Sequence, residues 1–460
     1  MTATIKRLGL GDLLFRRKGS IAFRVSLGIF DVALKLFFRR IETVNADTVP
    51  RSGGVIFALN HPNGLIDPAL VFVALPRKIS FLAKSTLFQT PVISYLLRTV
   101  EALPLYRRID PGEDTSKNLA TFKACRGRLK RGGSIALFPE GVSHNSPKLL
   151  PLKTGAARIA LGAASVHRDE GEVVVGIVPV GLYYSSKTTF RSEAMIYFGP
   201  SFPVEPVTLD DDGQPPRDAV RELTGRIETA LREVTLNAET ESDLARAHQA
   251  ERIFAAGKWN DDLSDRFRFI KEYIDERRLT GTNGKDHDRL QALIHEYDRK
   301  LIDRGIAAEH LSLAELPRGF VVRQAILRSW TLLLTLPFAI AGIIVHFPAY
   351  QLCKLFSYVY THHGADDVVS TVKVLAAMVF MPITWLVIAL VLYFYVGWWE
   401  AIVSIPIAVI CGYAALHTLE NIQELRGWGK AIWLFFTNRD MFLRLFVERQ
   451  NLHEQLMKIN

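Results

Sequence analysis

The sequence predicts an α/β domain with a layered sheet and flanking helices, followed by a helical connector and a C-terminal α-helical membrane region. Short apolar segments alternate with helical segments over residues 41–205, which is typical of α/β layers. Residues 216–320 are polar with helical periodicity, and residues 329–418 contain long apolar segments. We therefore divide the chain into the regions 1–40, 41–215, 216–320, 321–418 and 419–460.

The composition favours a protein that works at a membrane. The chain has 460 residues, 49% of them hydrophobic, which is enough for two or three structural regions and one sizeable core. Its net charge is +9, and residues 1–40 hold nine basic against two acidic residues. Basic residues beside apolar sequence favour an anionic membrane surface. We expect no nucleic-acid partner, since no matching motif or aromatic-basic platform is present.

The cysteines are few and scattered along the chain. They have neither the spacing of a disulfide framework nor that of a metal site, so a reducing compartment is indicated. The three are Cys125, Cys353 and Cys411.

Residues 20–38 have the pattern of a helix within a basic, amphipathic, membrane-associated N-terminal region. Polar or small residues form one narrow stripe and the other faces are apolar, as in a helix that lies in the plane of a membrane surface. A helix packed on the core of the next region fits equally well. The segment lacks the features of a signal peptide. The stripe consists of Ser20, Arg24, Gly28, Asp31 and Lys35.

The region 41–215 supplies the sheet. Apolar runs bounded by turn residues indicate strands at 54–60, 79–84, 133–138, 173–180 and 195–198. Helical segments lie between them, at 68–75, 90–99, 116–131 and 154–164. In such folds, ligands bind at the loops that follow the carboxyl ends of the strands.

The remaining regions are predicted to be helical. The charged connector has helical periodicity and a break at Gly281-Thr282-Asn283-Gly284, and we interpret it as a solvated connector or lid. Residues 330–349 and 374–396 are long enough to cross a bilayer, whereas 401–416 is short, so two or three crossings fit. Core helices of a soluble domain are the less favoured alternative. The region 419–460 reads as an amphipathic tail.

One stretch places a histidine and an aspartate around a tight turn. The apolar run 55–59 predicts a buried strand, and His61 lies where the following loop begins. Pro62-Asn63-Gly64 has turn chemistry, and Asp67 before a proline indicates the N-cap of a helix. This arrangement suits a general base with an orienting carboxylate. Taken alone, the stretch also fits a surface histidine beside an ordinary helix cap.

Three further stretches place charged residues at the ends of predicted elements. Arg107 begins a basic pair after a short apolar stretch, and an arginine fork matches phosphate oxygens bidentately. Glu140 and Gly141 follow the strand 133–138, so Glu140 lies at a strand end as His61 does. Lys153 lies at a predicted helix start. The simpler alternatives are a solvated basic pair and a strand-ending turn.

Together these motifs resemble those of the phospholipid and glycerol acyltransferase family, the PlsC-like superfamily. That family reads Asn-His-(x4)-Asp, apolar-Pro-apolar-x-Arg, Phe-Pro-Glu-Gly and an apolar-Pro segment, in that order. Five residues rather than four separate the histidine from the aspartate here, a form that looks like the fungal glycerol-3-phosphate/dihydroxyacetone-phosphate acyltransferases. The matching stretches are Asn60-His61…Asp67, Leu103-Pro104-Leu105-Tyr106-Arg107, Phe138-Pro139-Glu140-Gly141 and Val178-Pro179-Val180.

The resemblance implies acyl transfer from a thioester, acyl-CoA or acyl-carrier protein, to a glycerol-phosphate hydroxyl, with no cofactor and no metal. In this reaction His61 removes the hydroxyl proton, and Asp67 holds the imidazole tautomer and stabilises the imidazolium. Direct attack by the hydroxyl needs no enzyme nucleophile, and no G-x-S-x-G motif is present.

The resemblance also implies the residues that bind the acceptor. Arg107, with Lys84 or Lys153, would grip its phosphate. Glu140 is anionic and would orient Arg107 or bond an acceptor hydroxyl, and Gly141 would allow close approach.

Two alternatives stay open beside this interpretation. Lysophosphatidate shares the phosphate and is the nearest rival acceptor, followed by other lyso-lipids. A non-catalytic membrane lipid-binding or scaffold protein is the rival from another class, although the intact motif residues argue against it. For localisation we expect an integral membrane protein with its catalytic domain on the cytoplasmic face, because basic residues precede the first apolar segment.

Overall fold

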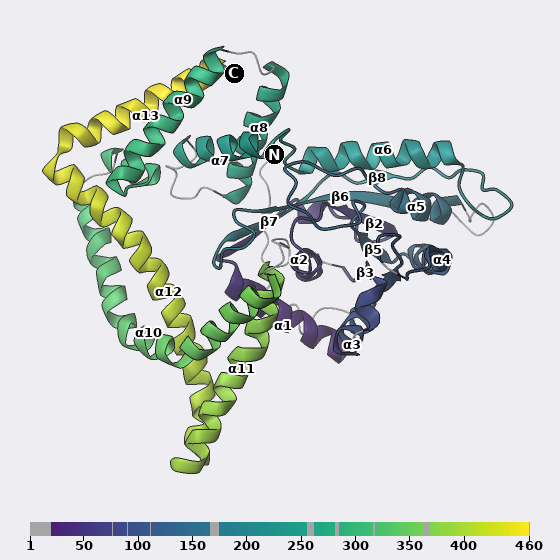
Figure 1. Cartoon of the computed structure of the whole chain (residues 1–460), viewed down its shortest axis with the longest axis horizontal. Coiled ribbons are helices and arrows are strands. Elements are labelled where there is room, and N and C mark those ends of the chain that lie inside the picture. The colour runs from purple at the N-terminus through teal and green to yellow at the C-terminus, as the bar shows by residue number, and fades with distance from the viewer. Residues whose placement is uncertain are drawn as a thin grey trace. The chain divides into compact units, whose positions relative to one another are not determined.

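The computed structural model (Figure 1) describes residues 20–459 apart from 76, 90, 111, 166–173, 255–261, 281–284, 316–317 and 362–368. The chain divides into two compact units, Met1–Asn237 with Gly364–Thr371, and Ala238–His363 with Val372–Asn460. A mixed sheet with flanking helices forms the first unit, and the second is helical. The predicted fold class is therefore confirmed, while the boundaries of the five predicted regions stay a prediction.

The sheet of the first unit has eight strands among the described residues. β2, β5, β3 and β4 are neighbours and run parallel, and β6 runs parallel to β2 on its other side. The carboxyl ends of these five strands therefore meet at one edge. β7 pairs antiparallel with β6 and parallel with β1. In sheet order the strands are β1 (Arg40–Val44), β7 (Glu193–Phe198), β6 (Val175–Tyr184), β2 (Gly54–Leu59), β5 (Ser134–Leu137), β3 (Ile79–Lys84) and β4 (Leu103–Leu105), with β8 (Phe202–Pro203) beside β6.

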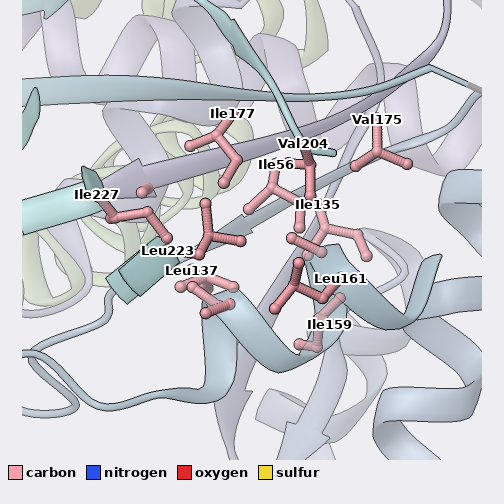
Figure 2. Close-up of a cluster of buried hydrophobic side chains, with 14 of the residues drawn as sticks. Ile56, Ile135, Leu137, Ile159, Leu161, Val175, Ile177, Val204, Leu223 and Ile227 are labelled. Carbon is pink, nitrogen blue, oxygen red and sulfur yellow. The ribbon is translucent and has the colours of Figure 1, made fainter. Parts of the chain in front are cut away.

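Helices cover both faces of this sheet. Side chains of β2, β5 and β6 form one core with those of α5 (Gly155–Ser165) and α6 (Arg217–Val234), including Ile56, Ile177 and Ile227 (Figure 2). Side chains alternate along a strand, so Phe57 points to the opposite face. Because every residue of β2 is buried, the strand reads as an unbroken apolar run. The other helices of this unit are α1 (Ile21–Phe37), α2 (Ile66–Ala74), α3 (Pro91–Thr99), α4 (Asn118–Lys130) and the short 3₁₀ helices Ala46–Thr48, Ser85–Gln89 and Thr115–Lys117.

Helix α1 combines the two interpretations of the N-terminal helix. Ser20 is its N-cap and accepts a hydrogen bond from the amide of Phe23. One apolar face is buried, and its residue Phe23 packs edge-on against Phe72 of α2. A second apolar stripe is exposed, by 39% at Leu36 and 72% at Ile21. This stripe comprises Ile21, Val25, Ile29, Val32 and Leu36.

Part of the predicted polar stripe lies on the buried side of this helix, as expected for a helix packed on the core. Gly28 and Asp31 are buried. The Asp31 carboxylate is paired with the ammonium of Lys35 at 2.7 Å, which compensates its burial. Residues 1–19, with most of the N-terminal basic residues, lie outside the described part of the chain.

The second unit contains three helices that are long and apolar enough to cross a membrane, Ser329–Tyr360, Val369–Tyr395 and Trp398–Thr437. In the most apolar 18-residue stretch of each helix, only 11% to 22% is buried in the protein. Most of these apolar side chains are therefore exposed, which suits contact with lipid. The predicted segment 401–416 is part of a 40-residue helix, so this helix is long enough to cross a bilayer. These three helices suggest membrane association.

The residues predicted to form the charged connector and the tail are helical as well, and their division into two regions stays a prediction. The break at Gly281-Thr282-Asn283-Gly284 lies outside the described residues. The helices are α7 (Glu241–Phe254), α8 (Leu263–Thr280), α9 (Lys285–Arg304), the 3₁₀ helix Ala308–Glu315, α10 (Arg318–Thr361), α11 (Val369–Tyr395), α12 (Trp398–Thr437) and α13 (Arg439–Ile459).

Helices α10 and α12 run beside each other (Figure 1) and cross closely at Gly342. A Cβ atom on Gly342 would lie 2.0 Å from the carbonyl oxygen of Cys411, so only glycine fits there. The neighbouring His346 donates from Nδ1 to the carbonyl of Gly342 and accepts at Nε2 from the indole of Trp385. Small residues at a crossing and a satisfied polar group are typical of helix packing in membranes.

We expect Gly342→Ala to lower the free energy of unfolding by about 1–3 kcal/mol, the usual cost of overpacking. The matched control is Gly429→Ala in α12, where an added Cβ meets nothing within 4 Å. Melting temperatures of the two purified variants in detergent make the comparison. Equal melting temperatures would contradict the close crossing.

Candidate active site

The loop after β2 brings His61 and Asp67 into contact. Asn60 directly follows the strand, and its side-chain amide pairs with the backbone of Leu182 in β6, at 3.1 Å and 2.7 Å. The turn that follows contains Gly64 at a φ of 40°, a left-handed conformation that favours glycine. As a result Nδ1 of His61 lies 2.8 Å from Oδ2 of Asp67. A carboxylate only accepts, so Nδ1 carries the proton and Nε2 is left as the base.

Asp67 is fully buried and accepts three hydrogen bonds. Oδ2 accepts from His61 and from the backbone amide of Asn63 at 2.7 Å, and Oδ1 accepts from the hydroxyl of Tyr184 at 2.5 Å. Asp67 is not the predicted N-cap, because α2 already begins at Ile66. Its side chain closes the turn instead of capping the helix, which explains how five intervening residues still allow the contact.

The face of the His61 imidazole ring is also in contact with a neighbouring residue. Its ring stacks on Phe138, with ring centroids 3.9 Å apart and planes 15° from parallel. The side chain is 18% exposed, so a reacting group can reach it. The amide of Leu65, in the same loop, donates to the hydroxyl of Thr371 at 3.1 Å.

Glu140 follows β5, next to β2 in the sheet, and its side chain holds the histidine loop. Oε1 accepts from the backbone amide of His61 at 3.0 Å, and Oε2 accepts from the amide of Leu150 at 2.8 Å. Oε2 also accepts from Nε2 of His144 at 2.5 Å, and the amide of Ser146 donates to the other ring nitrogen, which fixes this tautomer. Glu140 is 2% exposed. With these bonds its burial as a carboxylate is compensated.

These contacts replace the expected partner of Glu140. Among the described residues neither carboxylate oxygen contacts Arg107. Gly141, rather than Glu140, links the two parts of the site, since its carbonyl oxygen accepts from Nη1 of Arg107 at 2.7 Å. Gly141 has a φ of 80°, so this carbonyl is presented by a backbone conformation that favours glycine.

A cationic cluster forms at the ends of β3 and β4. Nε and Nη2 of Arg107 donate to the two carboxylate oxygens of Asp110 at 2.9 Å and 3.0 Å. Nζ of Lys84, the last residue of β3, lies 3.1 Å from the same carboxylate. The hydrogen bond from Arg107 lowers the pKa of Asp110; burial opposes this shift, and the bond from Lys84 adds to it. Two cations on one carboxylate leave a net positive charge.

Lys153 borders this site from the start of α5. Its backbone amide donates to the carbonyl of Pro139 at 2.7 Å. Its Cγ would lie 3.5 Å from a Cβ atom on Gly141, so the side chain passes that glycine, and the residue is exposed. The structure therefore places all the predicted site residues around one edge of the sheet. His61, Asp67 and Glu140 form one network, and Lys84 and Arg107 form another.

Sequence reasoning missed three residues of these networks. Asp110 joins Arg107 to Lys84, His144 supports Glu140, and Tyr184 binds Asp67. The available signal was position, since Tyr184 ends β6 at the same sheet edge as the other groups. Within the described part of the chain, no cluster of three His, Cys, Asp or Glu residues is placed to hold a metal ion.

Two family models match the chain. The model "Acyltransferase" matches residues 40–183, which include β2 to β5, all but the last residue of β6, and the site residues predicted from the sequence. The model "Glycerol-3-phosphate acyltransferase 2 C-terminal domain" matches residues 276–459, which include the three apolar helices.

Curated relatives agree with both models. The chain is 30% identical to glycerol-3-phosphate O-acyltransferase 2 of Saccharomyces cerevisiae over 60% of its length and 38% of the relative's. It is 25% identical to glycerol-3-phosphate O-acyltransferase 1 of the same yeast, over 92% of this chain and 69% of the relative. A 1-acyl-sn-glycerol-3-phosphate acyltransferase of Bacillus subtilis is 31% identical over 26% of this chain and 56% of the relative.

The predicted resemblance is thus confirmed in both halves of the chain. The motif residues lie in the part matched by the first model, and the apolar helices in the part matched by the second. The match to the first yeast relative spans less than half of that protein's length. Residues 40–183 match the acyltransferase family, residues 276–459 match the C-terminal domain of glycerol-3-phosphate acyltransferase 2, and the chain is homologous to the yeast glycerol-3-phosphate O-acyltransferases.

Proposed function

We propose that this protein is a membrane-bound O-acyltransferase that acylates the hydroxyl of glycerol 3-phosphate or dihydroxyacetone phosphate in phospholipid synthesis. The acyl donor is a thioester, acyl-CoA or acyl-carrier protein. The single observation that carries the proposal is the 2.8 Å contact between His61 and a buried carboxylate, at the same sheet edge as the cationic cluster of Arg107 and Lys84. A base beside an anion-binding cluster suits an acceptor with a hydroxyl and a phosphate.

In the proposed reaction the acceptor hydroxyl attacks the thioester directly. Nε2 of His61 takes the hydroxyl proton as the oxygen bonds to the carbonyl carbon, and Asp67 stabilises the resulting imidazolium. The tetrahedral intermediate collapses with cleavage of the C–S bond. The leaving thiolate then takes the proton back from His61, so the enzyme ends the cycle unchanged.

The acceptor phosphate is proposed to bind at Arg107 and Lys84. Three of the five guanidinium donors hold Asp110 and Gly141 in the described structure, which fixes the fork and leaves two donors for an anion. Lys153 lies close enough to Gly141 to add a second ammonium. In this arrangement Glu140 holds the backbone of His61 in place.

Lysophosphatidate is the second candidate acceptor, because it carries the same phosphate. The similarity to the 1-acyl-sn-glycerol-3-phosphate acyltransferase of Bacillus subtilis favours it over other lyso-lipids. The similarity to the two yeast relatives covers more of the chain and supports glycerol 3-phosphate or dihydroxyacetone phosphate.

Purified protein with labelled acyl-CoA and a panel of acceptors tests this proposal. We expect the highest kcat/KM with glycerol 3-phosphate or dihydroxyacetone phosphate. A higher value with lysophosphatidate would establish the second candidate. Absence of transfer to any acceptor, from either thioester donor, would support a non-catalytic lipid-binding protein.

For the location of the protein we infer that the sheet unit lies on the cytoplasmic face of a membrane. Cytoplasmic flanks of membrane spans are rich in Lys and Arg. Such residues precede the first apolar helix, namely Arg318, Arg323 and Arg328, and occur throughout the N-terminal region. The exposed apolar stripe of α1 supports contact with the bilayer surface.

We expect a chain truncated after Gly319 to leave the integral membrane fraction, because it lacks the three long apolar helices. It should still bind membranes through the basic N-terminal region, in a way that salt weakens. Alkaline extraction of membranes without detergent is the measurement. Retention of the truncated chain after extraction would contradict a C-terminal anchor and would make residues 20–38 a true span.

A further inference from the structure

The carboxylate of Asp67 has a second side-chain partner, besides the histidine, whose role the acyl-transfer mechanism does not specify. Tyr184 is the last residue of β6, and its hydroxyl donates to Oδ1 of Asp67 at 2.5 Å. Oδ2 of the same carboxylate accepts from His61 and from the amide of Asn63. The two oxygens are thus held from two sides, by the strand on one and by the loop on the other.

Both partners of this contact are removed from solvent. Asp67 is 0% exposed and Tyr184 is 7% exposed. Burial, followed by the negative charge of Asp67 and the hydrogen bond to it, raises the pKa of Tyr184 well above its ordinary value. The hydroxyl therefore keeps its proton and acts as a donor to the carboxylate.

The ring of Tyr184 is fixed independently of Asp67. The backbone of Tyr184 pairs with Ala194 of β7 in the antiparallel register. Its ring packs against Phe38, with ring centroids 5.7 Å apart. Because strand and ring are both held, the hydroxyl is a rigid reference point rather than a mobile surface group.

We propose that Tyr184 is a positioning residue for the catalytic pair of His61 and Asp67. Its hydroxyl orients the Asp67 carboxylate and takes up part of the negative charge of that carboxylate. As a result, His61 both accepts and releases its proton readily. This inference rests on the proposed function. Tyr184 touches neither the imidazole nor a substrate in this role, and it acts through Asp67 alone.

The hydrogen bond from Tyr184 to the Asp67 carboxylate has a direct consequence for the pH dependence of the reaction rate. A hydroxyl that donates to the carboxylate weakens the hold of that carboxylate on the imidazolium. Without the hydroxyl, His61 stays protonated up to a higher pH, and a protonated base does not react. The acidic limb of the pH–rate profile should therefore move upward when the hydroxyl is removed.

The other titratable groups near the pair are the same with and without this hydroxyl. Glu140 binds the backbone amide of His61, His144 binds Glu140, and Nζ of Lys187 donates to the carbonyl of His144 at 3.3 Å. None of these bonds involves Tyr184. A shift of the acidic limb in a variant at this position is therefore attributable to the contact with Asp67.

The test is Tyr184→Phe in the full-length protein, assayed for kcat, for both KM values and over a range of pH. We expect kcat to fall about tenfold, as for partners one contact removed from a metal-bound histidine. The acidic limb should rise by up to about 1 pH unit, the equivalent of one hydrogen bond. Both KM values should change by less than about twofold, because the hydroxyl does not touch a substrate in this role.

Tyr183→Phe is the matched control. It removes the same group from the preceding residue of β6, whose side chain points to the other face of the sheet, and it should leave kcat and the acidic limb unchanged. If Tyr184→Phe fails to accumulate as folded protein, 3-fluorotyrosine at position 184 replaces it. That residue keeps the ring and is a stronger donor, so it should move the acidic limb to lower pH.

An unchanged kcat and an unchanged acidic limb in folded Tyr184→Phe would overturn the inference. The inference would also be overturned if 3-fluorotyrosine at position 184 did not move the acidic limb of the pH–rate profile. His61→Ala, assayed alongside, separates this failure from failure of the proposed function. If His61→Ala stays active the proposed function is wrong, whereas an inactive His61→Ala beside a fully active Tyr184→Phe refutes only the role of Tyr184.

Discussion

Replacing His61 by alanine is expected to reduce kcat by about 10²–10⁴-fold, the range for loss of a general base. The imidazole that receives the acceptor proton is lost, while the carboxylate partner and the phosphate cluster remain. Because Glu140 binds the backbone amide of His61 and not its ring, the loop keeps this bond in the variant. The measurement is the initial rate of acyl transfer at saturating donor and acceptor.

Asp67→Asn is expected to lose less activity than His61→Ala, since the base remains but its tautomer and charge partner are disturbed. The exposed imidazole of His295 in α9 supplies the control, and His295→Ala should retain full activity. Membrane content and melting temperature of His61→Ala should match those of the wild type. Activity of His61→Ala near the wild-type level would refute the proposed mechanism.

Replacing Arg107 by alanine is expected to raise the KM for the acceptor roughly tenfold to a hundredfold. Loss of a hydrogen bond to a charged group costs about 1.5–3 kcal/mol, and the acceptor phosphate is the proposed partner. The KM for the acyl donor should change little, because the donor does not use this cluster. Steady-state kinetics with each substrate varied in turn measure both values.

Arg108→Ala is the control for this variant, since Arg108 is the exposed neighbour in the same basic pair. Arg107→Lys should give an intermediate KM, because an ammonium keeps the charge but not the planar fork. It also keeps a cation near the buried Asp110, which limits loss of stability. An acceptor KM that stays at the wild-type value in Arg107→Ala would remove Arg107 from the phosphate site.

The core of the sheet was predictable because its strands are buried on both faces. β2, β3, β5, β6 and β7 each contain an apolar run, and all five were predicted within a few residues of their observed bounds. β4 is three residues long and contains Pro104, and its short pattern is set by pairing with β3. No local pattern marks such a strand, because its partner lies some twenty residues away in the sequence.

The candidate site was predictable only where its parts are close in sequence. The contact between His61 and Asp67 follows from one turn of five residues. The partners of Glu140 depend on how residues 144–150 fold back. Asp110 binds both Lys84, at the end of β3, and Arg107, just after β4. Tyr184 was missed because the apolar pattern indicated a strand that ends at 180, whereas β6 continues to 184.

The buried face of helix α1 could not be predicted from its sequence either. Its sequence left open whether the helix lies on a membrane surface or packs on the core, and an aspartate is almost never buried without a partner. The carboxylate is buried because Lys35, one turn later, pairs with it. Local spacing allowed this pair, but only the packing of the helix on the sheet unit decided which face is covered.

The most direct test of the central claim is the release of thiol from acyl-CoA by the purified full-length protein, with and without glycerol 3-phosphate. Direct attack assisted by His61 predicts one thiol released for each acylated acceptor. Without acceptor it predicts no rapid burst of thiol and no acyl group bound covalently to the protein. A burst of one thiol per enzyme in the absence of acceptor, with the label retained on the denatured chain, would contradict this account.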